Sequence, residues 1–362
     1  MASALFYERA EMANENNRKK FLDVAKGVGI MMVTFGHITE IDNPVDHYLS
    51  LYKIVIFYVV SGYLLSYLNR YKDMGYGKFI LGVCRHIGLP YVLFSFAAIA
   101  VRMFRAFIRM QDMQIVFEEH FMEFITLKGI ATLWFLPTIF FSEIILFIIV
   151  KNIDHIFGKI ALASVFFWPL AVLTYWERFT PDLGPQSVAA KSIIAVWFMA
   201  AGFVYHKYIQ DHIDPRARFC IGVILSALTF WLSKFSLRID FNLMKFGEQP
   251  WVFFVGGIVG SFGLLLVLEG LEHIYVPKLL EYFGINSLIL MCAQRGLLML
   301  NLITAGWGKT FRLTDVVCPR FYLERLCILI LLLFMVGGLI ELINYCKRHI
   351  FVKKTIRRAE AA

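Results

Sequence analysis

The chain is poor in charged residues. Asp, Glu, Lys and Arg make up 17% of its 362 residues, whereas hydrophobic residues make up 59%. Soluble domains usually contain about 25% charged residues. The apolar residues gather in runs of roughly 18 to 25 residues, which is long enough to cross a hydrocarbon core about 30 Å thick. The composition therefore excludes an ordinary soluble domain and predicts an all-α polytopic membrane protein.

The six cysteines show no C-x-x-C pairing, and most of them fall in apolar runs. They are Cys84, Cys220, Cys292, Cys318, Cys327 and Cys346. This pattern is typical of small core residues and argues against a disulfide framework or a zinc site. We expect no metal.

Three further signatures are missing. The first twenty residues are polar, and the apolar run after them has no small-residue cleavage site, so this run is expected to be the first span rather than a cleaved signal peptide. Gly27-Val28-Gly29 has no third glycine and no preceding strand, which excludes a dinucleotide-binding loop. No internal repeat of the kind found in secondary transporters is evident.

The apolar runs predict about ten transmembrane helices in one membrane domain over residues 21–346. A cytoplasmic tail is expected over residues 1–20, and a basic cytoplasmic tail over residues 347–362. The ten expected helices cover residues 21–39, 48–68, 82–106, 131–150, 159–176, 191–208, 219–237, 251–271, 279–300 and 322–346.

The net charge of +9 is distributed unevenly between alternate loops. Basic residues follow every second span and fill the C-terminal tail, while the opposite loops are richer in acids such as Glu40, Asp42 and Asp46. The positive-inside rule then places both termini in the cytoplasm. Membrane topology accounts for the positive charge, so we expect no nucleic acid among the partners.

The stretch KGVGIMMVTFGH on the first expected span begins with Lys26 and ends with His37. Eleven residues separate them, so they differ by only about 20° around a helix and by about 16 Å along it. Lys26 would lie near the cytoplasmic surface, within reach of Asp23, and His37 deeper in the bundle. Ionisable groups in a membrane often mark function. A snorkelling lysine and a hydrogen-bonded structural histidine are the alternative.

Two more polar sites occur on the second and third expected spans. Ser61-Gly62 forms a small polar notch in a bulky helix, and helix packing also explains it. Arg85, followed by Pro90-Tyr91, lies near the inner end of the next span. Arg85 could form a phosphate site with Lys26 and Lys78, or it could only anchor the topology.

Later spans contain the remaining candidates. Glu143 lies in the middle of the fourth expected span, after Trp134-Phe135-Leu136-Pro137. A lone carboxylate in a membrane needs a partner or a role, and Lys26, Lys53 or Arg295 could pair with it. Asn286-Ser287 precedes Gln294-Arg295 in the ninth span, where Arg295 should face the bundle interior and either bind an acidic group or neutralise Glu143.

Taken in order, these stretches resemble the membrane acyltransferase family three, which includes O-antigen and exopolysaccharide O-acetyltransferases. The resemblance covers roughly residues 20–345. On the first span it rests on the basic residue and histidine, Lys26 and His37, and on the second on Phe57 and Ser61-Gly62-Tyr63. On the third span it rests on Arg85 with Pro90-Tyr91, and on the fourth on the Trp-Phe-Leu segment within residues 133–137. In many members a histidine stands at the position of Gln294 here, so a role for a second histidine is in doubt.

The resemblance implies transfer of an acetyl group from cytoplasmic acetyl-CoA to a sugar hydroxyl of a lipid-linked glycan, such as O-antigen, on the extracytoplasmic side of a bacterial inner membrane. A hydroxyl needs a general base, and histidine is the usual one. We therefore expect His37 to be the base and Glu143 to be a second catalytic candidate. Lys26, Asp23, Lys78 and Arg85 would hold the donor.

Six further residues would either contact the acceptor or serve only the structure. They are Ser61, Trp134, Asn286, Ser287, Gln294 and Arg295. Two questions stay open at this point. His37 could carry the acetyl group covalently rather than act as a base. The competing class is a transporter or flippase for a sugar conjugate, which ten spans and intramembrane charges would also suit.

Overall fold

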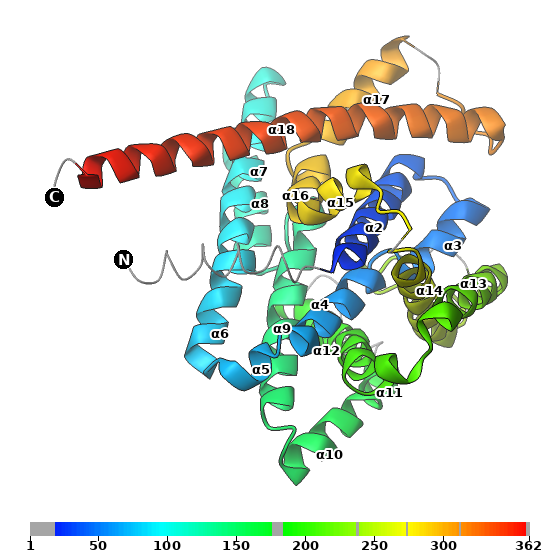
Figure 1. Ribbon diagram of the computed structural model, residues 1–362. Coiled ribbons are helices and arrows are strands. Elements are labelled where there is room, and N and C mark those ends of the chain that lie inside the picture. The colour runs from blue at the N-terminus through cyan, green and yellow to red at the C-terminus, as the bar shows by residue number, and fades with distance from the viewer. Residues whose placement is uncertain (1–18, 176–183, 237–238, 273, 311–312, 360–362) are drawn as a thin grey trace.

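The computed structural model describes residues 19–175, 184–236, 239–272, 274–310 and 313–359. Helices make up almost all of the regular structure in these ranges (Figure 1). The only extended pairing in them is an isolated antiparallel bridge between Asp240 and Lys245. The prediction of an all-α protein is therefore confirmed.

Eight helical stretches in the described ranges are long and apolar enough to cross a bilayer, so the chain is a multi-pass membrane protein. Several of them join two or three labelled elements end to end. They are α2 (Lys20–Thr39); α3 (Pro44–Tyr52) with α4 (Val55–Tyr67); α6 (Tyr76–Val83), the π-helical η1 (Cys84–Gly88) and α7 (Leu89–Ile108); η2 (Ala131–Trp134) with α9 (Phe135–Lys151); α12 (Gly184–Val204) with η4 (Tyr205–Ile209) and η5 (Gln210–His212); α13 (Pro215–Leu232) with η6 (Ser233–Phe235); α14 (Pro250–Leu271); and the first part of α18 (Pro319–Ala359).

The remaining helices are shorter. They are α5 (Arg70–Asp73), α8 (Met113–Ile125), α10 (Ile156–Val165), α11 (Trp168–Tyr175), α15 (Lys278–Ile285), α16 (Ser287–Gly296) and α17 (Met299–Thr310). The pair α16 and α17 is bent by 56° and would count as a ninth span if it crossed the bilayer as one broken helix.

The expected count of ten differs from this structure at the fifth predicted span, residues 159–176. Here the described chain forms two short helices, α10 and α11, that meet at a turn over Phe166 and Phe167. Pro169 is the second residue of α11. Proline cannot donate a backbone hydrogen bond and disfavours helical geometry in the residue before it, so a continuous helix is interrupted at this point.

The ninth predicted span, residues 279–300, is also divided. Asn286 separates α15 from α16, and its side-chain amide donates a hydrogen bond of 2.9 Å to the carbonyl of Tyr282. Asparagine competes for backbone groups in this way and therefore ends helices.

The two predicted tails can be compared only in part. The helical backbone of α18 continues to Ala359, through much of the predicted basic C-terminal tail. Residues 1–18 of the predicted N-terminal tail lie outside the described ranges.

Close helix packing at glycines fixes the position of α2. A Cβ atom on Gly27 would collide with the backbone of Leu280 in α15, and one on Gly284 would collide with the backbone of Asp23. Gly62 of α4 meets the backbone of α12 in the same way, so the glycine of the Ser61-Gly62 notch serves helix packing. These contacts bring α2 and α4 into the interior of the bundle, where most of their residues are buried.

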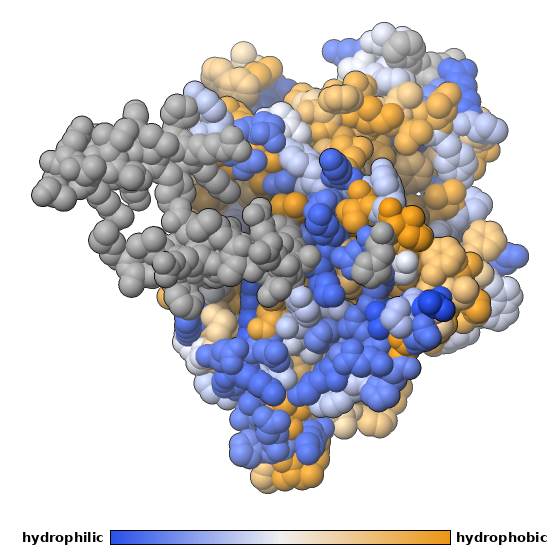
Figure 2. Space-filling model, in the orientation of Figure 1, coloured by the Kyte–Doolittle hydropathy of each residue, from blue (hydrophilic) through white to orange (hydrophobic). Residues whose placement is uncertain are grey.

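The outer surface is strongly apolar. Leu93 is 59% exposed, Phe104 65% and Phe334 76%. Figure 2 shows broad hydrophobic areas in the upper half of the view, while hydrophilic side chains gather in the lower half. A soluble monomer rarely exposes such continuous apolar surface. Lipid tails would cover it in a membrane, as the composition predicts.

Candidate active site

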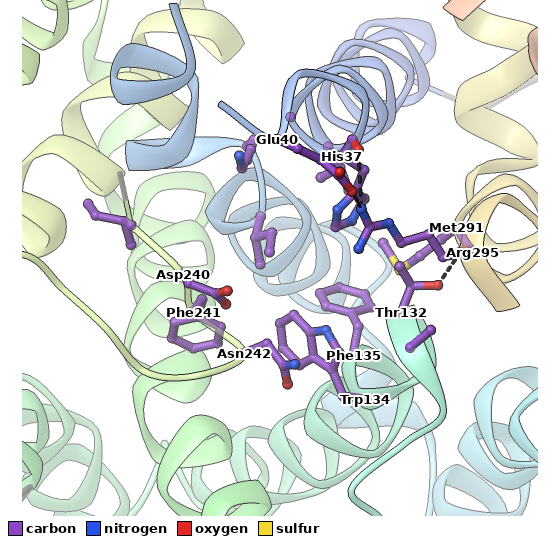
Figure 3. A pocket seen from close by; sticks show the side chains of 16 residues that line it. His37, Glu40, Thr132, Trp134, Phe135, Asp240, Phe241, Asn242, Met291 and Arg295 are labelled. Atoms are coloured by element: carbon purple, nitrogen blue, oxygen red, sulfur yellow. Dashed lines mark hydrogen bonds and ion pairs between the residues drawn. The ribbon is translucent and has the colours of Figure 1, made fainter. Parts of the chain in front are cut away.

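A cavity of about 530 Å³ lies where α2 ends. Its walls come from the last turn of α2, the turn between α3 and α4, η2 with the first residue of α9, the segment after α13, and α16. Figure 3 shows His37 and Arg295 beside each other on one wall, with Asp240, Phe241 and Asn242 across from them. The volume is in the range of small-molecule binding sites.

The way in which α2 ends places His37 at this cavity. The helix finishes at Thr39, and Glu40 adopts a left-handed conformation with φ of 48°. An L-residue rarely adopts this conformation, and it turns the chain sharply one turn after His37. The Arg295 guanidinium holds this corner, since its Nη2 donates to the His37 carbonyl at 3.2 Å and also pairs with the Glu40 carboxylate.

Arg295 is positioned by hydrogen bonds that other elements make to its helix, α16. Thr132 in η2 donates a hydrogen bond of 2.8 Å to the carbonyl of Met291 in α16. Arg102, from α7, donates to the carbonyls of Gly296, at 2.6 Å, and Arg295. Carbonyls at a helix C-terminus have no partner within the helix, and a nearby cation satisfies them. Arg102 therefore fixes the end of α16 from which Arg295 reaches His37.

Trp134 and the segment from Ile239 to Asn242 form the opposite wall. The Lys191 ammonium, only 2% exposed, lies 4.9 Å from the centre of the Trp134 ring and donates to the backbone and side-chain oxygens of Asn242. A cation over an aromatic face is an attractive contact. Lys191 thus ties the aromatic surface to the polar segment and keeps both in place.

The predicted donor residues lie away from this cavity. Lys26 pairs with Asp23 at 2.8 Å, as the sequence suggested, and Asp23 is buried. Lys78 in α6 and Arg85 in η1 are exposed. The elements α6 and η1 pack mainly on α9, whereas α2 packs mainly on α15, so the main helix contacts do not bring Lys26 next to Lys78 or Arg85.

Glu143 lies in a different place from His37. It lines a separate cavity of about 90 Å³ together with Ser61 and Arg70. The Ser61 hydroxyl hydrogen-bonds its carboxyl, and Arg70 contributes an attractive charge. The two cavities share no lining residue. The structure therefore groups Glu143 with Ser61 and not with His37.

The cations that the sequence offered as partners for Glu143 all pair elsewhere in the described chain. Lys26 pairs with Asp23, and Arg295 pairs with Glu40. Lys53 pairs with Asp46 at 2.7 Å. Arg295 consequently does not neutralise Glu143.

Three further candidates are on or next to α16. Asn286 is engaged with the Tyr282 carbonyl, and Ser287 begins α16; neither lines either cavity. Gln294 is fully buried, and neither its Oε1 nor its Nε2 has a hydrogen-bond partner within the described residues. A buried amide without partners is costly and rare in native proteins.

Sequence reasoning missed several cavity residues. Glu40 entered the sequence analysis only as an acidic loop residue, and neither Asp240 nor Asn242 belongs to a motif that it identified. Lys53 was considered only as a partner for Glu143. One signal was available for Lys53 and Lys191: each is a lone lysine in an apolar run, where a charge needs a specific environment.

The comparison with protein families identifies the family of the chain. Residues 19–343 match the family described as "Acyltransferase domain", acyltransferase family 3. The chain belongs to acyltransferase family 3. No curated protein and no solved structure matches the chain. The family consists of acyltransferases, so the protein is an acyltransferase enzyme, and this membership favours enzyme over flippase.

Proposed function

We propose that this acyltransferase moves an acetyl group from acetyl-CoA to a sugar hydroxyl of a surface polysaccharide or its lipid-linked precursor, with His37 as the general base. The observation that supports this most is the cavity at the end of α2. It places His37 opposite the Trp134 ring and the oxygen-bearing side chains of Asp240 and Asn242. Flat aromatic faces and planar polar groups are what a sugar ring requires for stacking and hydrogen bonding.

In this proposal the His37 imidazole takes the proton of the acceptor hydroxyl as the oxygen attacks the thioester. Such a positioned base typically accelerates a reaction by about 10²- to 10⁴-fold. Arg295 keeps His37 in position by bonding its backbone carbonyl. Trp134 and Arg295 act on the acceptor side in this proposal, which is one of the two roles that the sequence left open for them.

The donor is proposed to approach from the other end of α2. Lys26, held by its ion pair with Asp23, supplies a cationic group for the phosphates of acetyl-CoA. Lys78 and Arg85 do not lie next to Lys26, so they would contact the donor at a separate point. Lys26 and His37 are about 16 Å apart along the helix. The positive-inside rule places the Lys26 end and both termini in the cytoplasm, and the His37 cavity toward the outside of a bacterial inner membrane.

The test of this function is the composition of the surface glycan. Polysaccharide from cells with and without the protein is compared by mass spectrometry, with a strain that produces His37→Ala as the matched control. We expect the loss of one acetyl mass per modified sugar in both the deletion strain and the His37→Ala strain. An unchanged glycan mass in the deletion strain would contradict the proposal.

A second measurement separates direct transfer from a covalent acetyl-histidine. Purified protein is incubated with acetyl-labelled acetyl-CoA and no acceptor, then unfolded and analysed for label. Direct transfer predicts no label on His37, whereas a nucleophilic histidine predicts stable or transient label at that residue.

A further inference from the structure

Lys53 is a cation in the wall of the large cavity that the sequence did not assign to the site. It lies in the turn between α3 and α4, and its side chain is 12% exposed. The lysine lines the cavity together with Gly36 and His37. A buried ammonium group is expensive, so its retention at this point needs a physical reason.

Gly36 shows how closely the ammonium approaches α2. A Cβ atom at position 36 would lie 2.5 Å from Lys53 Nζ and 2.8 Å from Asp46 Oδ1. Real Cβ atoms essentially never make contacts that short, so a larger residue at position 36 would require the Lys53 and Asp46 side chains to shift. Lys53 therefore lies against the backbone of the residue that precedes His37.

A buried carboxylate fixes the direction of the ammonium. Asp46 is 0% exposed and accepts a hydrogen bond of 2.7 Å from Lys53 Nζ. Asp46 is itself positioned in the first turn of α3, where its backbone N–H donates to the side chain of the capping residue Asn43 at 2.9 Å. An ammonium has three N–H donors, and the bond to Asp46 uses one of them.

The other cations around the cavity are committed to different contacts. Arg295 bonds the His37 carbonyl and Glu40, which suits it to holding the corner of α2. Lys191 does not line the cavity, because it lies against Trp134 and Asn242. Among the lysines and arginines of the described chain, Lys53 and Arg295 alone line this cavity, and Lys53 is the more deeply buried of the two.

We propose that the Lys53 ammonium, oriented by Asp46, donates a hydrogen bond to the thioester oxygen and stabilises the oxyanion that forms during acyl transfer. This inference rests on the proposed acetyl transfer. Fixed donors aimed at developing negative charge are often the largest single contribution to catalysis, and loss of one typically costs about 10²- to 10³-fold in kcat.

The step balances as follows. The acceptor oxygen forms a bond to the carbonyl carbon while its proton moves to His37, and the carbonyl electron pair moves onto the oxygen facing Lys53. The oxyanion then collapses, the carbonyl re-forms and the carbon–sulfur bond breaks. The sulfur leaves with the electron pair and takes up the proton, which yields the acetylated sugar and CoA thiol.

The test uses full-length protein purified in detergent, with acetyl-CoA as donor and total envelope glycan extract of the producing cells as acceptor. CoA thiol release is measured with a thiol reagent, and a parallel assay uses water alone as acceptor. Lys53→Met alone would leave the buried Asp46 carboxylate without its cation. The decisive variant is therefore the double substitution Lys53→Met with Asp46→Asn. Lys309→Met, at an exposed position, is the matched control.

We expect the double variant to keep the thermal unfolding midpoint and the KM for acetyl-CoA of the wild-type protein, while its kcat falls about 10²- to 10³-fold. A double variant that unfolds at the wild-type temperature and retains kcat within about threefold would overturn the inference and leave Lys53 and Asp46 as a structural pair. If the wild-type protein releases no thiol with either acceptor, the proposed function fails, and this inference fails with it.

Discussion

The two cavities of this acyltransferase both contain an ionisable side chain within an apolar span, yet they differ in what surrounds it. His37 faces a cavity of about 530 Å³ whose walls come from five separate segments of the chain. Glu143 faces one of about 90 Å³ that is lined mainly by leucine, phenylalanine and methionine. Only the first has room for a substrate and several polar groups to orient it.

The difference shows that an ionisable residue in a membrane helix is an incomplete indication of function. Glu143 is accommodated by one hydroxyl and one arginine, Ser61 and Arg70. Around His37, by contrast, Arg295, Lys53, Asp240 and further polar groups converge from segments far apart in the sequence. Convergence of several polar groups at one cavity is a stronger argument for catalysis than the cost of any single buried charge.

The largest effect is expected at the first cavity. Replacement of His37 by alanine should lower kcat for acetyl transfer by about 10²- to 10⁴-fold, because it removes the proposed general base. The measurement is CoA thiol release by the purified variant, with the unfolding temperature as a control for structure. A well-folded His37→Ala protein with near-normal transfer would show that His37 is not the general base.

An intermediate effect is expected at the other end of α2. Lys26→Gln combined with Asp23→Asn removes the ion pair without leaving a buried charge. Loss of one charge-assisted contact to a phosphate should weaken CoA binding about tenfold, since about 1.4 kcal/mol corresponds to one power of ten. Calorimetric titration with CoA measures this. Unchanged affinity would assign Lys26 to structure alone.

The smallest effect is expected at the second cavity. Glu143→Gln keeps a hydrogen-bond acceptor for Ser61 and removes only the charge, so kcat should change by less than about threefold. The assay is again CoA thiol release, at saturating acetyl-CoA, with wild-type protein measured in parallel. A loss comparable to that of His37→Ala would remove the contrast between the cavities and restore Glu143 to the catalytic set predicted from the sequence.

Much of the fold was predictable because span length and apolar composition are local properties. Of the ten predicted spans, eight coincide with helices that can cross a bilayer. The fifth and ninth predicted spans are each divided into two helices, near Pro169 and at Asn286 respectively. Hydropathy alone underestimates how strongly these two residue types interrupt a helix. The pairing of Lys26 with Asp23 was also predictable, since residues three apart share one helix face.

The partners of the isolated charges were not predictable. Asp46 lies about two helical turns before Lys53, at the end of the same helix, and Glu40 meets Arg295 from a different part of the chain. Glu143 had three plausible cations, and the structure gave it a fourth, Arg70. Spacing along one helix cannot resolve such choices, because they depend on which helices pack together.

The sequence by itself determined that this protein spans a membrane with helices and has Lys26 and His37 on one face of the first, since both follow from composition and helical periodicity. The tertiary structure alone decided what His37 meets. Glycine contacts fix α2 against α15, and the left-handed turn at Glu40 ends the helix. Lys53 then lies beside Gly36, where a larger residue would require the ammonium to shift.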